Sequence, residues 1–350
     1  MTAGSDPIDD PERSARAYWT GADGRGEVRR EALGEVVEGT VLIRTLYSCL
    51  SRGTESLVHH GRIPQGERER MRAPFQIGDF PHPVKYGYMS VGVVEEGPDG
   101  LVDSVVHCLH PHQDRYVVPA GAVVPVPRGV PPRRAACAAN VETAVNVLWD
   151  ARPLVGDRVA VVGAGAVGCI AARLASSVAG ARVTLLDINA DRARIADALG
   201  VEFEQVERSG EVALPAGEAD LVLHASGTSA GLALALTLAG DEATVVEASW
   251  HGDQPVQLPL GGPFHARRLR IVSSQVGTIP PHRARRWTYA RRMALALELL
   301  RDDAFDALVT GEHPFDEIET ALPRAIDDPN TVCTVFRYPG PPPHSGPHPR

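Results

Sequence analysis

The feature that most constrains the fold is a glycine-rich turn between a strand-like and a helix-like segment. Residues 158–162 read RVAVV, and Gly163, Gly165 and Gly168 follow in GxGxxG spacing before an alanine-rich run. In such a turn the first glycine permits the sharp bend, the second lets the backbone approach a pyrophosphate, and the third lets the helix pack on the strand. The spacing predicts a dinucleotide site, and a glycine-rich turn in another doubly wound fold is the alternative. The phosphate-binding backbone is expected at Gly163, Gly165, Ala166, Val167 and Gly168.

An acidic residue at the end of the next strand-like segment predicts which dinucleotide is bound. The run RVTLLD ends at Asp187, 19 residues after Gly168. A carboxylate there accepts hydrogen bonds from the adenosine ribose and repels a 2′-phosphate, so NAD is expected and NADP is less favoured. Arg192 is the competing signal, because its guanidinium could bind a 2′-phosphate. We expect this arginine to be solvated.

Two hydrophobic patterns divide the chain into two domains. From 133 to 277 strands alternate with helices, which predicts a parallel sheet covered on both faces. From 28 to 125 short strand-like segments are separated by Gly and Pro, which predicts a β-rich unit of small-barrel type. The fold class is therefore α/β, a β-rich catalytic domain plus a Rossmann doubly wound parallel sheet domain. The predicted boundaries are a disordered tail at 1–14, the β-rich domain at 15–138 and 278–338, the Rossmann domain at 139–277, and a disordered tail at 339–350.

Composition excludes several classes of function. With 35 Lys and Arg against 44 Asp and Glu, the net charge of −9 argues against a nucleic-acid partner. The apolar runs are too short to span a bilayer and no export-signal pattern opens the chain, so we expect a cytoplasmic protein with no membrane partner. The cysteines are odd in number, scattered and never in CxxC spacing, which predicts free thiols in a reducing compartment. They are Cys49, Cys108, Cys137, Cys169 and Cys333.

Local phrases resemble the medium-chain dehydrogenase/reductase superfamily. They are LSRGTE at 50–55, PVKYGYMSVGVV at 83–94, AACAANVETAVNVLWDA at 135–151 and GEHPFDEIETAL at 311–322. The resemblance implies a GroES-like catalytic domain, an active site in the cleft between the domains, and a homodimer formed through the strand in LRIVSSQVG. More narrowly, SRGTE, KYGY and FHARRLRIVSSQVG are similar to the subgroup that contains the bacteriochlorophyllide a dehydrogenases.

The zinc ligands of this superfamily are replaced. The Cys position falls at Arg52, the His position at Tyr88 and the following Glu at Met89, and only Cys108 lies in the region of the structural-zinc lobe. Arginine, tyrosine and methionine are poor zinc ligands, so we expect no zinc and no other metal. The alternative is a rebuilt site in the segment HCLHPH, 107–112, where His110 and His112 project to the same side of an extended chain.

Without a Lewis acid, hydrogen-bond donors must stabilise the substrate oxygen. The resemblance places the Thr54 hydroxyl beside the reacting alcohol, and Tyr88 is the expected phenolic donor, with a buried structural tyrosine as the alternative. Glu142 and His112 are the candidate proton-transfer groups, although Glu142 could also be a hydrogen-bonded helix residue. Arg52 is expected to bind an anionic part of the substrate, with an ion pair to Glu55 as the alternative.

The remaining site residues follow from the rule that ligands bind outside the carboxyl ends of parallel strands. For the cofactor they are Ala225, Ser226, Gly227, Ser249 and Gln275, and for the substrate Trp250 and His251. A core position is the alternative for Trp250. Five arginines between 283 and 292 are expected to form a solvated helix face.

These observations predict a zinc-independent NAD(H)-linked oxidoreductase that interconverts an alcohol and a carbonyl on a small organic substrate. Two alternatives stay open. One is a reductase of an activated C=C bond, and the other is a non-catalytic dinucleotide-binding sensor or structural protein.

Overall fold

The computed structural model describes residues 13–207 and 212–340, and the chain divides into two compact units. The first comprises Met1–Ala139 and Gly311–Arg350, and the second comprises Asn140–Thr310. Most of the two tails expected to be disordered lies outside the described residues, but Ser14 already begins a strand. Residues 278–310 also differ from the predicted division, because they group with the second unit. The buried contacts of Arg292 with helix α3, described below, explain this grouping.

The first unit is built from two sheets. The smaller has the strand order β2-β1-β5-β4, and the larger has the order β16-β17-β3-β6-β7-β9 with β8 also paired to β3. Their strands are β1 Ser14–Thr20, β2 Gly26–Ala32, β3 Thr40–Leu50, β4 Ile77–Gly78, β5 Val84–Lys85, β6 Ser90–Glu96, β7 Val105–Cys108, β8 Arg115–Pro119, β9 Val123–Pro125, β16 Val309–Pro314 and β17 Cys333–Arg337. The helices are α1 Arg52–His59, α2 Pro132–Ala135 and α10 Ile318–Asp327, with 3-10 turns at Ala22–Gly24, Gln65–Glu67, Ala120–Ala122 and Phe315–Glu317.

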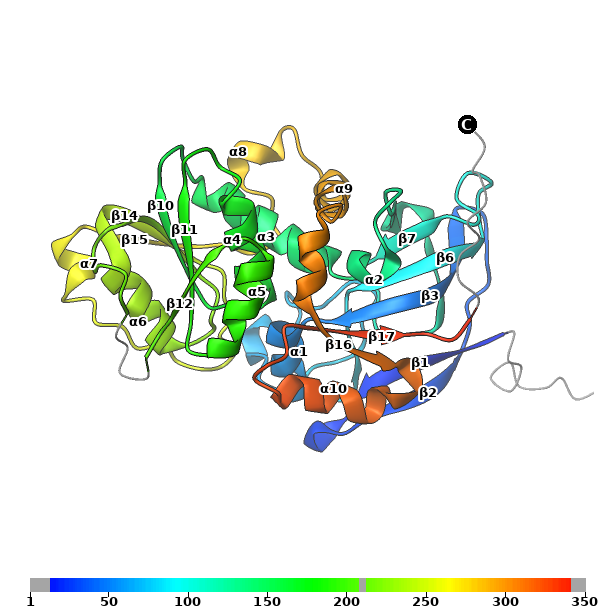
Figure 1. Cartoon of the computed structure of the whole chain (residues 1–350). Helices are drawn as coiled ribbons and strands as arrows, with labels where there is room; N and C mark the ends of the chain where they lie inside the picture. The colour runs from blue at the N-terminus through cyan, green and yellow to red at the C-terminus, as the bar shows by residue number, and fades with distance from the viewer. Residues whose placement is uncertain (1–12, 208–211, 341–350) are drawn as a thin grey trace, which may run out of the picture. The chain divides into compact units, whose positions relative to one another are not determined.

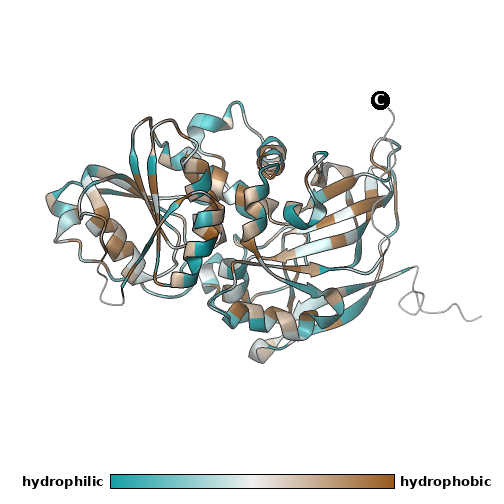
Figure 2. Cartoon of the chain, viewed as in Figure 1, coloured by the Kyte–Doolittle hydropathy of each residue, from teal (hydrophilic) through white to brown (hydrophobic). Residues whose placement is uncertain are grey.

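Strand β3 is a central strand of the larger sheet, because it is paired along both edges. Its partners β6, β8 and β17 all run antiparallel to it. Valine, isoleucine and tyrosine side chains from β3, β6, β7 and β8 fill one core cluster, and α10 closes a second with Leu50, Phe315 and Phe336. Figure 2 shows hydrophobic residues, in brown, along β3 and β6. Burial of this apolar area holds the unit together.

The second unit contains a six-stranded, fully parallel sheet in the order β12-β11-β10-β13-β14-β15. This is the 3-2-1-4-5-6 order of a Rossmann domain. Its strands are β10 Arg158–Val162, β11 Arg182–Asp187, β12 Glu202–Gln205, β13 Ala219–His224, β14 Ala239–Glu247 and β15 Arg270–Ser273. Its helices are α3 Ala138–Ala151, α4 Ala166–Ala175, α5 Ala193–Ala198, α6 Ser229–Leu238, α7 Pro263–Ala266, α8 Pro281–Ala284 and α9 Tyr289–Leu299, with 3-10 turns at Ala190–Arg192 and Asp303–Leu308.

Helices cover both faces of the parallel sheet. Figure 1 shows α4 and α5 on one face and α6 on the other. Val162, Leu186, Val222 and Val245 of the strands pack with Leu236 of α6 in one buried cluster. The predicted fold class, a β-rich unit plus a doubly wound parallel sheet, is confirmed. In the part of the chain that the structure describes, no helix combines the length and the hydrophobicity that a membrane span needs.

Candidate functional site

The turn between β10 and α4 has the backbone that its glycines require. Gly163 has a φ of +108°, and its N–H donates to the carbonyl of Leu186 at 2.8 Å. A Cβ on Gly163 would lie 2.6 Å from the amide nitrogen of Ser226, and a Cβ on Gly168 would overlap the carbonyl oxygen of Gly163. These two glycines are therefore needed for packing of the turn against its neighbours.

Gly165 is different, because the space beside it is open. It precedes α4 without a side-chain cap, and a Cβ built on it would meet no heavy atom within 4 Å. The N–H of Cys169 bonds to the carbonyl of Gly165 at 2.9 Å, so the amides of Ala166, Val167 and Gly168 lie in the first turn, where no intrahelical acceptor exists. Open space and N–H donors at a helix N-terminus are what a pyrophosphate needs.

Asp187 ends β11 beside this turn. Its Oδ2 accepts from the N–H of Ala164 at 2.7 Å, and its Oδ1 accepts from the N–H of Asn189 at 2.8 Å. These bonds fix the carboxylate at the strand end while the side chain stays half-buried. The expectation of a solvated Arg192 is wrong, since only 5% of this residue is exposed. It ends the 3-10 turn Ala190–Arg192, which places its side chain inward.

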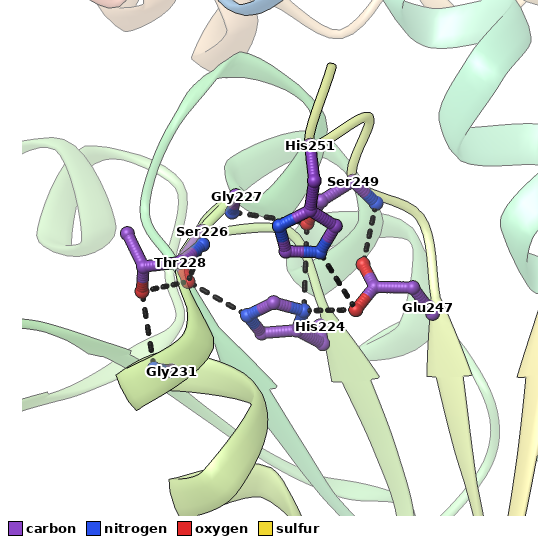
Figure 3. A network of polar contacts seen from close by, with 8 residues as sticks. All are labelled: His224, Ser226, Gly227, Thr228, Gly231, Glu247, Ser249 and His251. Carbon is purple, nitrogen blue, oxygen red and sulfur yellow. Dashed lines mark hydrogen bonds and ion pairs between the residues drawn. The ribbon is translucent and has the colours of Figure 1, made fainter. Parts of the chain in front are cut away.

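The ends of β13 and β14 carry a polar network, drawn in Figure 3. The Ala225 N–H donates to Val162 at the end of β10, and the Gly227 N–H donates to Oγ of Ser249 at 3.0 Å. The structure thus brings Ala225, Ser226, Gly227 and Ser249 together at the carboxyl edge of the sheet. Their role in cofactor binding stays a prediction.

Sequence reasoning missed two members of this network, His224 and Glu247. Nδ1 of His224 lies 2.6 Å from Oε2 of Glu247, and Nε2 of His224 lies 2.7 Å from Oγ of Ser226. Burial by itself would raise the pKa of Glu247, but hydrogen bonds from His224 and Ser249 outweigh it and lower the pKa. The available signal was that each residue is the last of an apolar strand.

The other residues expected near the substrate and nicotinamide lie in the turns after β14 and β15. Trp250 is half-buried and outside the main core, so the alternative interpretation of this residue as a core tryptophan is not supported. His251 is also half-buried and places Nε2 3.4 Å from Oε2 of Glu247. Gln275 is exposed, and its Oε1 accepts from the N–H of Gly277 at 2.6 Å.

In the first unit, Tyr88 and Thr54 meet. Tyr88 lies just before β6 and Thr54 is in α1, yet the phenol is hydrogen-bonded to the side chains of both Ser51 and Thr54. Burial raises the pKa of Tyr88 to about 12, against the lowering effect of these two hydroxyls, and Glu55 adds to the increase. The phenol is therefore protonated at neutral pH and can donate a hydrogen bond.

His112 lies in a buried chain of polar side chains. Its Nε2 is 3.0 Å from Oε2 of Glu55, and its Nδ1 is 2.7 Å from Oγ of Ser48, which in turn lies 3.0 Å from the hydroxyl of Tyr338. The other oxygen of Glu55 accepts from the N–H of Ser51 at 2.8 Å. Sequence reasoning identified His112 but not Ser48 or Tyr338, because the pairing of separate strands brings them together.

The structure does not gather the histidines of the segment 107–112 into the alternative metal site. The His110 ring stacks on Tyr116 with centroids 3.6 Å apart and an interplanar angle of 5°. Burial lowers the pKa of His110 to about 3 and that of His107 to about 4, so both are neutral at physiological pH. Within residues 13–207 and 212–340, no cluster of three potential ligands includes any histidine of the segment 107–112.

Arg52 and Glu142 have structural partners. Nε of Arg52 donates to the carbonyl of Ile326 at 3.0 Å. Oε1 of Glu142 accepts from Nε of Arg292 at 3.0 Å, with both side chains buried. The expectation that all five arginines between 283 and 292 are solvated is therefore wrong for Arg292, which is 2% exposed. This contact favours the interpretation of Glu142 as a hydrogen-bonded helix residue.

Two clusters could hold a metal ion in the part of the chain that the structure describes. They are Cys49, Cys137 and Cys333, and His224, Glu247 and His251. The cysteines are scattered in sequence, but β3 and β17 are adjacent strands, and the Sγ atoms of Cys49 and Cys137 lie 4.0 Å apart. Hydrogen bonding with Cys137 raises the pKa of the Cys49 thiol, hydrogen bonding with Cys333 raises that of the Cys137 thiol, and burial adds to both, so both are protonated at neutral pH.

Comparison with known proteins relates each unit to dehydrogenases. Residues 153–232 match the family model of the alanine dehydrogenase/PNT C-terminal domain. The chain is 26% identical over 306 residues to D-guloside 3-dehydrogenase of Escherichia coli, covering 79% of this chain and 87% of the relative. It is 30% identical over 146 residues to L-threonine 3-dehydrogenase of Ruegeria pomeroyi, a match that spans only 41% of this chain and 39% of that protein.

Solved structures agree in fold along nearly the whole chain. L-idonate 5-dehydrogenase of Escherichia coli has a TM-score of 0.75 at 14% identity, covering 93% of this chain and 98% of that one. A zinc-binding dehydrogenase of Sinorhizobium meliloti bound to NADP has a TM-score of 0.71 at 18% identity, covering 93% and 99%. A short chain alcohol dehydrogenase of Escherichia coli CFT073 complexed with NADH has a TM-score of 0.72 at 16% identity, covering 93% of this chain and 99% of that one.

In its fold, a GroES-like unit plus a Rossmann unit, the chain resembles the zinc-type alcohol dehydrogenase-like enzymes of the medium-chain dehydrogenase/reductase superfamily. The predicted resemblance is confirmed at this level. The narrower similarity to the bacteriochlorophyllide a dehydrogenase subgroup stays a prediction.

Proposed function

We propose that this chain is an NAD(H)-linked oxidoreductase that interconverts an alcohol and a carbonyl on a small organic substrate without a catalytic zinc. An NAD(P)-dependent oxidoreductase of the medium-chain type is the class to which the fold and the dehydrogenase relatives point. The observation that carries the finer proposal is the phenol of Tyr88, held by the hydroxyls of Thr54 and Ser51 at the position where the zinc branch has a ligand.

The second unit supports the cofactor part of the proposal. The open space at Gly165 and the first-turn amides of α4 fit a pyrophosphate, and the carboxylate of Asp187 fits the adenosine ribose. When bound, the nicotinamide accepts or supplies the hydride. We favour NAD over NADP because Asp187 would repel a 2′-phosphate, and the buried Arg192 provides no solvated guanidinium at the surface to offset that repulsion.

The first unit supports the proton-transfer part. Tyr88 would donate a hydrogen bond to the substrate oxygen, and Thr54 would share the proton with it. His112 has both ring nitrogens hydrogen-bonded, to Glu55 and to Ser48. Since Glu55 also binds the backbone of Ser51, His112 would orient the Ser51–Tyr88 pair. Arg52, Trp250 and His251 remain our candidates for substrate contacts.

Zinc independence rests on the chemistry of the replaced ligands. Arg52 and Tyr88 cannot supply the thiolate and the imidazole that catalytic zinc requires, and Met89 is 1% exposed and part of the core. Activity that is unchanged after treatment with EDTA and gel filtration would agree with this proposal. Activity that is lost with EDTA and restored by Zn²⁺ would contradict it.

The decisive experiment is turnover with a panel of alcohols, ketones and enones, followed by the nicotinamide absorbance. We expect alcohol oxidation with NAD and the reverse reaction with NADH. Tyr88→Phe should lose activity and keep NADH binding, whereas Tyr47→Phe, a half-buried tyrosine on β3, should keep both. Turnover of enones alone would favour a C=C reductase. Tight NADH binding with no turnover of any substrate would favour a non-catalytic dinucleotide-binding protein.

We also propose that the protein is a cytoplasmic homodimer, formed through β15. This strand is the edge of the parallel sheet, and its Ile271 and Val272 are 37% and 39% exposed. An unpaired edge strand with exposed apolar side chains is suited to pairing with a second copy. Sedimentation of the wild type and of Val272→Lys tests this, and a wild-type monomer would contradict it.

A further inference from the structure

His224, Glu247 and His251, here called the His–Glu–His cluster, form a group in which only His251 has a place in the proposed reaction, as a candidate substrate contact. His224 ends β13, Glu247 ends β14 and His251 lies in the turn that follows (Figure 3). One ligand atom of each residue lies within 4.8 Å of the other two. His224 is fully buried, whereas Glu247 and His251 are half-buried. The cluster is thus fixed at its base and accessible at its outer side.

Both imidazoles face the same carboxylate oxygen. Oε2 of Glu247 lies 2.6 Å from Nδ1 of His224 and 3.4 Å from Nε2 of His251. The two rings are nearly parallel, with an interplanar angle of 17° and centroids 6.1 Å apart. Without an ion, two ring N–H groups converge on one oxygen. An ion bound at this place would replace these two converging N–H···O contacts by three separate metal–ligand bonds.

The residues around the cluster orient its ligands. The second oxygen of Glu247 accepts from the N–H of Ser249 at 2.7 Å, which fixes the carboxylate. Nε2 of His224 lies 2.7 Å from Oγ of Ser226. If Nδ1 of His224 binds a metal, the ring proton moves to Nε2 and is donated to this hydroxyl. Metal-binding histidines usually make such an outer hydrogen bond through their second nitrogen.

We propose that the His–Glu–His cluster binds one first-row divalent transition-metal ion, of which Zn²⁺ is the best match. Two imidazoles and one carboxylate are ligands that zinc accepts, and three protein ligands leave a position for water or another ligand. The site lies in the second unit and uses none of the positions where the superfamily holds zinc. The proposal does not depend on the proposed oxidoreductase activity.

The thiol cluster of Cys49, Cys137 and Cys333 is the weaker candidate for the same ion. All three cysteines are at most 1% exposed, and the pKa values of the Cys49 and Cys137 thiols are raised, so these two are not ionised. A metal there must displace the thiol protons in a buried place with little water. The His–Glu–His cluster has an ionised carboxylate and a partly exposed histidine, so binding needs less rearrangement.

The test uses the full chain, stripped with EDTA and studied without dinucleotide. Co²⁺ is added as a spectroscopic probe, and Zn²⁺ binding is measured by calorimetry and by elemental analysis after dialysis. We expect one ion per chain and no thiolate-to-cobalt charge-transfer band. Glu247→Gln and His251→Gln should abolish binding, and Ser226→Ala should weaken it by about 10- to 100-fold, the usual effect of losing an outer hydrogen bond.

Matched variants separate the two clusters. Cys137→Ser should bind Co²⁺ and Zn²⁺ like the wild type, and circular dichroism should show all variants folded. No binding by the wild type, or equal binding by His251→Gln and wild type, would overturn the proposal. So would a thiolate charge-transfer band that disappears in Cys137→Ser. Because turnover is not measured in this test, its failure leaves the oxidoreductase proposal standing. In the separate activity assay, EDTA sensitivity of the His251→Gln variant would indicate an ion bound elsewhere.

Discussion

Arg292 of α9 and Glu142 of α3 form a buried ion pair 3.0 Å long, and the same guanidinium donates to Asn146 and to the carbonyl of Val276. Removing one partner of a buried pair costs about 3–5 kcal/mol, because it leaves the other charge unpaired. Arg292→Met should lower the free energy of unfolding by about this amount, measured with urea. The double variant with Glu142→Gln should lose less than the sum of the single variants. If Glu142→Gln instead reduces turnover at unchanged stability, Glu142 is a catalytic group.

The second and third glycines of the motif should respond differently to alanine. Gly165→Ala adds a methyl group to open space, so the protein should unfold like the wild type but bind NADH more weakly. In Gly168→Ala the new methyl group collides with the carbonyl of Gly163, so stability and NADH binding should both fall. Thermal unfolding and NADH fluorescence titration distinguish the two. Equal NADH affinity of Gly165→Ala and wild type would place the pyrophosphate elsewhere.

Asp187 should determine the preference for NAD. Asp187→Ser removes the charge that repels a 2′-phosphate and the acceptor for the ribose hydroxyls. We expect the NADH affinity to fall about tenfold, which corresponds to about 1.4 kcal/mol, and the NADPH affinity to rise. The measurement is a pair of binding titrations on the same preparation. A wild type that already binds NADPH more tightly than NADH would refute the assignment.

Tyr88 should act as a proton donor over the whole physiological range. Burial raises the pKa of its phenol to about 12, so the group is protonated well into alkaline solution. Tyr88→Phe should reduce kcat by about 100- to 1,000-fold, as expected for one lost oxyanion donor. If kcat of the wild type falls with rising pH below about pH 11, this fall cannot come from Tyr88, and it should persist in Thr54→Val. A variant with unchanged kcat would assign Tyr88 a purely structural role.

His110 should make the protein sensitive to acid. Its pKa in the folded state is lowered to about 3, whereas the unfolded chain binds the proton near the usual value of 6.5. The stabilising effect is therefore complete above about pH 6.5 and is lost as pH falls toward 3, at about 1.4 kcal/mol per pH unit. His110→Phe, which keeps a ring against Tyr116, should show a shallower loss of stability between pH 6 and pH 4. An identical pH dependence would show that the imidazole is solvated in the native state.

The local part of the fold could be predicted because its signals lie within short stretches of chain. The strand at 158–162, the three glycines and Asp187 act on neighbours a few residues away, so their spacing by itself indicates a Rossmann unit. The boundary predicted between residues 138 and 139 lies beside the division of the two compact units at Ala139 and Asn140. The second boundary was predicted between residues 277 and 278, whereas the compact units divide between Thr310 and Gly311. The grouping of 278–310 depends on the buried contacts of Arg292, and a run of arginines usually indicates a solvated face.

The sequence by itself determined the two-unit architecture and the glycine-rich turn of the Rossmann unit, and it predicts that Arg52, Tyr88 and Met89 replace the zinc ligands. Only the tertiary structure decided which distant side chains meet. The thiols of Cys49 and Cys333 lie close because β17 pairs with β3, and His224 meets Glu247 because β13 pairs with β14. Such contacts depend on strand order and register over the whole sheet. Burial then sets which groups hold their protons, so these sites are decided by packing and not by spacing along the chain.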